Sequence, residues 1–130
     1  MSEEKIKFFT DLIVWQEAHK LVLSIYKSTE SFPRREFYSL IDQMRRATVS
    51  VTSNIAEGFS RQTLKEKIQF YSIARGSLTE LQNQLMVARD VKYVDINIFD
   101  EISAQTVAVH KLLNAIISKT KIISNQSSTF

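Results

Sequence analysis

The sequence predicts an all-α fold, an antiparallel up-down-up-down four-helix bundle, on three observations. The 130 residues include only two glycines and one proline, whereas sheet proteins need turn residues about every eight to twelve positions. Long stretches carry apolar residues at the spacing of helical turns. The segments between these stretches are short, and short connections place consecutive helices antiparallel.

The first helix is expected from Asp11 to Thr29, with Asp11 as its N-terminal cap. Ser31-Phe32-Pro33 ends this helix, because the residue before a proline is pushed out of the helical conformation. Its apolar residues recur at core spacing. They are Leu12, Trp15, Ala18, Val22, Ile25 and Tyr26.

The second helix is expected from near Arg34 to about Ser60, close to Gly58. With Phe37 set to zero and about 100° added per residue, its side chains divide into three surfaces. The apolar face holds Phe37, Leu40, Ile41, Met44, Thr48, Val51, Ile55 and Phe59. A polar stripe holds Gln43, Ser50, Asn54, Glu57 and Arg61, and the remaining side holds Arg34, Arg35, Arg45 and Arg46. This division predicts a helix that packs through its apolar face, makes specific polar contacts through its stripe, and binds a charged partner through its arginines.

Thr63 and Glu66 have the spacing of a capping box, which predicts a third helix from there to about Asp90. Val91 to Asp95 should form a turn, and a fourth helix should follow to about Ile122. Both helices have an apolar face. The faces hold Phe70, Ala74, Ser77, Leu78, Leu81, Leu85 and Ala88 in the third helix, and Phe99, Ile102, Thr106, Val109, Leu113 and Ile116 in the fourth. Residues 1–123 are thus expected to form one domain, and the polar, aperiodic tail 124–130 to be disordered.

The composition bounds the functional classes. A net charge of +3 and a pI of about 9.2 are mildly basic, short of the dense Lys and Arg surface of a strong nucleic-acid binder. The absence of cysteine excludes disulfides and thiolate metal sites. No apolar run approaches the roughly 18 residues of a membrane span, and the acidic start lacks the apolar core of a secretory signal. We therefore expect a cytoplasmic protein with no membrane partner.

Neither a metal site nor an active site is expected. His19 and His110 are the only histidines, whereas a metal site needs three or four ligands at suitable spacing. Glu57 and Glu80 could form an acid–base pair across two helices, but Arg61 four residues after Glu57 favours an ion pair along one helix. No serine has a histidine base at a suggestive spacing, and neither glycine lies in a phosphate-binding loop pattern. We expect no catalytic residue, no metal and no cofactor.

Two features indicate specific packing. Gly76 lies mid-helix, where glycine costs about 1 kcal/mol relative to alanine. Close approach of another backbone, from a bundle neighbour or another subunit, would offset that cost; a merely tolerated glycine is the alternative. Gly58 and Gly76 are therefore the candidates for close packing. Asn54, Glu57 and Arg61 lie on one side of the second helix, and with Ser77 and Glu80 they are expected to form a buried or interfacial polar network.

Five strings occur in order over nearly the whole chain except its ends. They are Leu12-x-Val14-Trp15-Gln16-x-Ala18, Phe32-Pro33-x-x-Glu36, Gln43-Met44-Arg45-Arg46-Ala47, Ser53-Asn54-Ile55-Ala56-Glu57-Gly58 and Ala74-Arg75-Gly76-Ser77-Leu78-x-Glu80-Leu81. In this combination the chain resembles the bacterial four-helix-bundle proteins first noticed as reading frames in intervening sequences of 23S ribosomal RNA genes.

The resemblance implies a homopentameric ring without established enzymatic activity. It also implies kinship with accessory proteins of diversity-generating retroelements, basic bundles that bind nucleic acid and a reverse transcriptase. Two functions follow as hypotheses. In the first, the protein binds RNA or DNA as an accessory protein, with Arg34, Arg35, Arg45 and Arg46 as the contact surface. In the second, it is an assembly scaffold whose partner is a protein.

Overall fold

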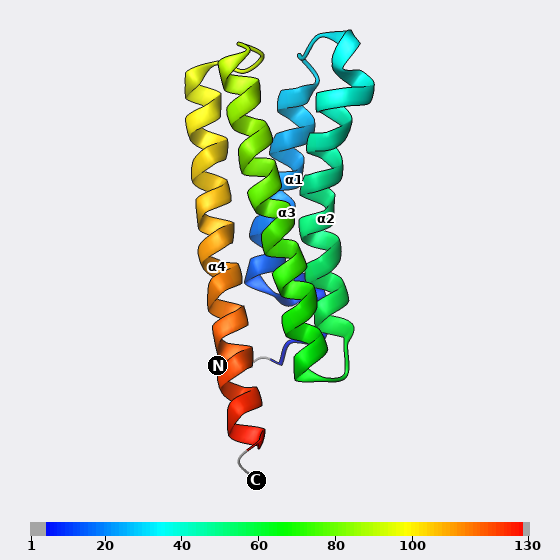
Figure 1. Ribbon diagram of the computed structural model, residues 1–130, viewed down its shortest axis with the longest axis vertical. Helices are drawn as coiled ribbons and strands as arrows, with labels where there is room; N and C mark the ends of the chain where they lie inside the picture. The colour runs from blue at the N-terminus through cyan, green and yellow to red at the C-terminus, as the bar shows by residue number, and fades with distance from the viewer. Residues whose placement is uncertain (1–4, 129–130) are drawn as a thin grey trace.

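The fold of the computed structural model, which describes residues 5–128, is an antiparallel four-helix bundle (Figure 1). Its helices are α1 (Ile13–Thr29), α2 (Asp42–Ser60), α3 (Leu64–Asp90) and α4 (Ile96–Ser128), and residues 5–128 contain no strand. The α1–α2 and α3–α4 connections lie at the upper end in Figure 1, and the α2–α3 connection at the lower end. Helix α3 packs most extensively, against α2 and α4, while α1 packs against α2 and α4. The predicted fold class is confirmed.

One hydrophobic core runs along the bundle axis. Its largest fully buried side chains come from all four helices, and each such leucine or isoleucine contributes roughly 1.5–3 kcal/mol. They include Leu21, Ile25, Met44, Ile55, Leu78, Leu81, Leu85 and Leu113. Most of the predicted core positions are buried or half-buried, but Tyr26 and Phe37 are 40% and 50% exposed. The prediction was wrong for these two aromatic residues.

The start of α1 also differs from the prediction. Asp11 ends a 3₁₀ turn, η1 (Phe9–Asp11), and its carboxylate accepts the backbone N–H groups of Lys7 and Phe8 at 3.0 and 3.1 Å. These two hydrogen bonds, that from Phe8 foremost, lower the pKa of Asp11. Helix α1 then begins after the extended residue Leu12, without a side-chain cap. Asp11 therefore orders the segment before the helix instead of capping it.

The second helical segment is not uniform. It begins with a 3₁₀ turn, η2 (Arg34–Glu36), continues as a π-helical turn, η3 (Phe37–Ile41), and becomes α-helical only at Asp42. A π-helical turn holds more residues than an α-helical turn, so side chains before Asp42 are rotated relative to a spacing of about 100° per residue. This rotation explains why Phe37 leaves the apolar face. It also separates Arg34 and Arg35 from the line of Arg45 and Arg46.

The ends of α3 carry two capping structures. At its start, the backbone N–H of Glu66 donates to the Thr63 hydroxyl at 3.1 Å, as predicted. The Glu66 carboxylate accepts a hydrogen bond from the Thr63 hydroxyl, whereas in a complete capping box it would accept one from the backbone N–H of Thr63. At its end, the backbone N–H of Lys92 donates to the carbonyl of Arg89, and the backbone N–H of Tyr93 donates to the carbonyl of Ala88. This pair of hydrogen bonds is a Schellman motif. Lys92 has a φ of 71° at the position that usually holds glycine.

Helix α4 is longer than predicted. It continues to Ser128 and extends beyond the α2–α3 connection (Figure 1). The expected disorder is therefore wrong for residues 124–128, and residues 129–130 lie outside the described part of the chain. Ile117 and Thr120 are the last buried residues among residues 96–126, and residues 121–126 of the helix are exposed apart from the half-buried Ser124.

Candidate nucleic-acid interface

Arg45 is a structural link between α1 and α2. Its Nε donates to Thr29 Oγ1 at 3.0 Å, its Nη2 donates to the Tyr26 carbonyl at 3.3 Å, and its guanidinium lies 4.5 Å from the centroid of the Tyr26 ring. Thr29 is the last residue of α1, so the arginine also places a positive charge at the negative end of that helix. Two of its five N–H groups are thus used within the protein and the guanidinium is held against α1, so Arg45 serves mainly as a structural link.

The other three predicted arginines point in different directions. Arg46 pairs with Asp42 at 3.0 Å along α2, with both side chains exposed, so the pair contributes only a few tenths of a kcal/mol. Arg35 Nη2 lies 3.5 Å from Tyr93 Oη, toward the α3–α4 connection. Arg34 is exposed and has no acidic partner within ion-pair distance among residues 5–128. The predicted single arginine surface is therefore divided.

An exposed aromatic pair, Phe37 and Tyr38, projects from the π-helical turn. The two side chains are 50% and 89% exposed, and their rings meet edge to face with centroids 4.9 Å apart. An open groove lies on each side of the pair. One groove is lined by Tyr26, Ile41, Asp42, Arg45, Arg46, Val49, Ser50 and Ser53, and the other by Thr29, Glu30, Phe32, Arg34, Ile41 and Arg45, in addition to the pair. A uniform helix would have buried Phe37, so the sequence pattern missed this feature.

The predicted polar network divides into two separate groups. Ser50 and Ser77 join α2 to α3 through a hydroxyl–hydroxyl hydrogen bond of 2.8 Å, and Asn54 Nδ2 donates to the Ser50 carbonyl at 2.8 Å. Glu57 and Arg61 form the expected ion pair at 2.8 Å, but their side chains are 50% and 38% exposed.

No hydrogen bond within the described residues joins these two groups. The side chain of Glu80 is exposed and has no hydrogen-bond partner among those residues. A buried network in one protomer is therefore wrong. An interfacial role for these residues stays a prediction.

The two glycines occupy opposite environments. A Cβ at Gly58 would lie 2.7 and 2.9 Å from two ring carbons of Tyr71, so α3 packs tightly against α2 there. Beside it, Lys67 Nζ donates to the Phe59 carbonyl at 2.7 Å and covers the C-terminal end of α2. A Cβ at Gly76 would meet nothing within 4 Å among the described residues. Close approach of a bundle neighbour to Gly76 is therefore wrong, and close approach of another subunit stays a prediction.

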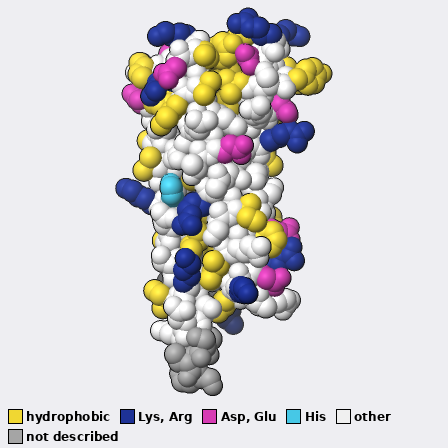
Figure 2. All heavy atoms as spheres, in the orientation of Figure 1, with side chains coloured by type: hydrophobic (Ala, Val, Ile, Leu, Met, Phe, Trp, Pro, Cys, Tyr) yellow, Lys and Arg dark blue, Asp and Glu magenta, His cyan; other side chains and the backbone are white. Residues whose placement is uncertain are grey.

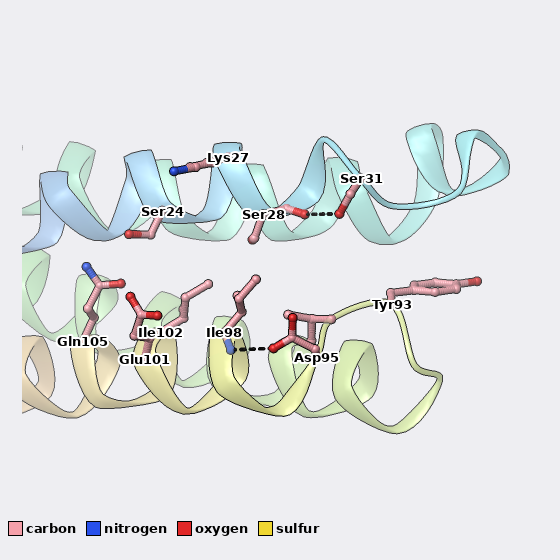
Figure 3. A pocket seen from close by; sticks show the side chains of 11 residues that line it. Ser24, Lys27, Ser28, Ser31, Tyr93, Asp95, Ile98, Glu101, Ile102 and Gln105 are labelled. Atoms are coloured by element: carbon pink, nitrogen blue, oxygen red, sulfur yellow. Dashed lines mark hydrogen bonds between the residues drawn. The ribbon is translucent and has the colours of Figure 1, made fainter.

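A further groove of about 530 Å³ lies between the upper parts of α1 and α4 (Figure 3). Two of its polar groups make hydrogen bonds at the helix ends: Asp95 accepts the N–H of Ile98 at 3.0 Å, and the Ser31 hydroxyl donates to the Ser28 carbonyl at 3.1 Å. No histidine lines the groove to activate a serine. Across residues 5–128, no three His, Asp or Glu side chains are placed to hold a metal ion. The helices described there also lack the combination of length and apolarity needed to span a bilayer.

The net positive charge of residues 5–128 lies in the lower half of the bundle. Residues 5–23, 50–77 and 110–128 form this half and carry ten Lys and Arg against four Asp and Glu, a formal charge of +6. Residues 24–49 and 78–109 form the upper half, with seven against eight, a formal charge of −1. After Glu101 the sequence has no acidic residue.

Figure 2 shows Lys and Arg side chains over the lower parts of α3 and α4. We call the cations that α3 and α4 contribute to this region the basic face. They are Lys65, Lys67, Arg75, Lys111, Lys119 and Lys121. These cations share one end of the bundle and do not form a single line, because Lys119 and Lys121 are two residues apart and thus about 160° apart around α4. Arg75 also links the two helices, since its Nη1 donates to Asn114 Oδ1 at 2.9 Å.

Comparisons with known proteins agree with the fold. A crystal structure of a protein of unknown function from the S23 ribosomal protein family of Bacteroides thetaiotaomicron is 20% identical, with a TM-score of 0.75. The match covers 82% of this chain and 96% of that chain. No curated protein is significantly similar in sequence. The family model described as 23S rRNA-intervening sequence protein matches residues 10–115, so the chain belongs to this family.

Proposed function

We propose that this protein is a non-enzymatic, oligomeric accessory protein that binds nucleic acid through the basic face of α3 and α4. The observation that carries the proposal is the separation of charge, +6 in the lower half against −1 in the upper half. The name of the family refers to 23S rRNA, which favours RNA as the first ligand to test. A reverse transcriptase remains the protein partner that the sequence resemblance suggests.

The basic face suits the phosphate backbone. Lys111, Lys119 and Lys121 are exposed on α4, and Lys65 is exposed on the neighbouring α3. Flexible lysines make phosphate contacts that carry no sequence information, and each contact releases counterions. Binding should therefore be salt-sensitive and largely indifferent to sequence. This assignment replaces the four arginines as the main contact surface, because Arg45 is held against α1 and the four side chains do not form one surface.

Self-association would multiply this modest charge. We infer a homo-oligomer, with a pentamer favoured by the family resemblance. An exposed stripe on α3 is available for such contact, because Ile73, Gly76, Glu80 and Val87 follow one another at helical spacing and are all exposed. In a ring, each copy would add a basic face, and several weak contacts to one nucleic acid would combine into avidity.

The test compares two charge-reversed proteins that have the same net charge. Lys119→Glu/Lys121→Glu removes two cations from the basic face, and Lys27→Glu/Lys92→Glu removes two exposed cations from the upper half. Affinity for fluorescently labelled structured RNA and duplex DNA is measured by anisotropy across a salt series, after light scattering has shown equal oligomer masses. The basic-face variant should bind at least tenfold more weakly than wild type, and the control should change much less.

Equal weakening in the two variants would show that overall charge, and not the basic face, determines binding. Absence of binding by the wild-type protein at low salt would contradict the proposal. The second hypothesis, a scaffold for another protein, would then be the better explanation of the exposed apolar residues on α3.

A further inference from the structure

We propose that the aromatic pair Phe37 and Tyr38 binds unpaired bases of a single-stranded nucleic acid, at the upper end and away from the basic face. The inference rests on the proposed function, since its ligand is also nucleic acid. It adds a second contact site and names the form of nucleic acid that this site recognises.

The first support is the presentation of the rings. Tyr38 is 89% exposed, whereas an ordinary aromatic residue of a small bundle buries most of its ring. Phe37 lies against it edge to face, so the pair offers two differently oriented ring surfaces side by side. Exposed aromatic faces of this kind take up successive bases of single strands by stacking, which does not require a particular sequence. Paired bases inside a duplex cannot reach them.

The second support is the distribution of cations around the rings. Arg34 lines the groove on one side of the pair, and Arg46 lines the groove on the other side. Arg34 has no acidic partner within the described residues, and the exposed Arg46–Asp42 pair is weak enough to exchange for a phosphate. Figure 2 shows hydrophobic side chains beside Lys and Arg at this end of the molecule. A strand whose bases stack on the rings would therefore find a guanidinium on either side for its backbone.

The third support is that the π-helical turn holds the pair in place. Glu36 accepts the Ser39 hydroxyl at 2.6 Å and the Tyr93 hydroxyl at 2.8 Å, and Ile41 is buried at the other end of the turn. Turns of this kind are frequent at functional sites. Because the backbone is already ordered, binding does not have to bear the entropy of fixing a loop.

Charge favours nucleic acid over a protein partner at this position. Three arginines line the two grooves, against only Glu30 and Asp42. A ligand with regularly spaced negative charges and flat apolar groups matches both the arginines and the rings. An apolar protein surface would match the rings alone.

The experiment measures binding of wild type and three Tyr38 variants to a fluorescent 20-nucleotide oligo(dT) or oligo(rU) and to a duplex of equal length. Tyr38→Ala removes the ring, Tyr38→Leu keeps an apolar side chain without a ring, and Tyr38→Trp keeps a stacking surface. Because Tyr38 is almost fully exposed, the variants should fold and assemble as wild type, which circular dichroism and light scattering check. Tyr38→Ala and Tyr38→Leu should weaken single-strand binding about tenfold, and Tyr38→Trp should retain it. Duplex affinity should stay within about twofold in all three.

Arg34→Gln provides an independent measurement, because loss of one phosphate contact should reduce the slope of the salt dependence by about 0.7 for a single strand. Unchanged single-strand affinity in Tyr38→Ala, or an equal loss for the duplex, would overturn the inference while leaving the proposed function intact. A change of oligomer mass in Tyr38→Ala would overturn it in favour of a protein contact. Absence of all nucleic-acid binding by wild type would overturn both proposals.

Discussion

Replacing each of the two glycines by alanine should change stability in opposite directions. Gly76 lies in the interior of α3, and a Cβ there meets nothing within 4 Å among the described residues. Gly76→Ala should therefore gain most of the helix-propensity difference, about 1 kcal/mol in the free energy of unfolding of the protomer. For a chain of this length that is a rise in Tm of about 4 °C.

At Gly58 the same substitution introduces a steric conflict. The new Cβ would lie 2.7 Å from Cε1 of Tyr71, a ring that is only 3% exposed and therefore has little room to move. Overpacking of this kind costs about 1–3 kcal/mol, which exceeds the propensity gained. Gly58→Ala should lower the free energy of unfolding by about 1 kcal/mol, so the two variants should differ by about 2 kcal/mol.

Urea unfolding followed by circular dichroism at 222 nm measures both values, at two protein concentrations. At low concentration, a destabilised Gly76→Ala or a neutral Gly58→Ala would refute the reasoning. High concentration tests the remaining alternative at Gly76. If another copy packs against this glycine, the added methyl group should reduce the oligomer mass in light scattering, and the gain in stability should disappear as concentration rises.

The remaining predictions concern side chains that the structure places in defined roles. Arg45→Ala should lower the free energy of unfolding by about 1–2 kcal/mol, measured by urea unfolding, because Thr29 and Tyr26 lose their donor. Lys92→Gly should raise it by about 1 kcal/mol in the same assay, because glycine adopts a φ of 71° without strain. Glu57→Ala should change the stability of the protomer by less than about 0.5 kcal/mol, since its ion pair is exposed; a larger loss that depends on concentration would reveal an interface. Hydrogen bonds to the Glu36 carboxylate, from Ser39 foremost and also from Tyr93, lower its pKa below the ordinary value of 4.5. The stabilisation from these hydrogen bonds is therefore present above pH 4.5 and is lost as the pH falls through the lowered pKa. Thermal melts below pH 4.5 should therefore show a shallower acid-induced loss of Tm in Glu36→Gln than in wild type.

The four helices and most of the core could be predicted from the sequence because repeated apolar spacing is a local property. Leu78, Leu81 and Leu85 follow that spacing and are buried in α3. The π-helical turn was not predictable in this way, since it depends on contacts from distant parts of the chain. Tyr93 reaches Glu36 across 57 residues of sequence, and no periodicity records that contact.

The candidate site was predicted less well, for two physical reasons. The angular position of a residue on a helix gives the location of its Cα atom but not where a long side chain ends. The Arg45 side chain lies across the neighbouring helix and donates its hydrogen bonds there. The basic face, in turn, combines lysines far apart in the sequence. Lys65 and Lys121 come to the same end of the bundle only because α3 and α4 are adjacent and antiparallel. The polar composition after Ile123 predicted disorder, whereas helix continues through Ser128.

The π-helical turn also has a consequence for how this family can vary in length. Such a turn accommodates one residue more than the α-helical turn that it replaces, so it is equivalent to a one-residue insertion whose effect ends at Asp42. Deletion of Ser39 should restore an ordinary α-helical turn and leave the core positions of α2 unchanged. On a uniform helix of that length, Phe37 and Tyr38 would lie about 100° and 200° from the centre of the apolar face. A chain one residue shorter between Pro33 and Asp42 should therefore keep the same bundle and still present Tyr38 outward. A chain of the present length that is α-helical throughout the segment would instead return Phe37 to the apolar face, so the π-helical turn preserves the outward orientation of the pair despite the additional residue.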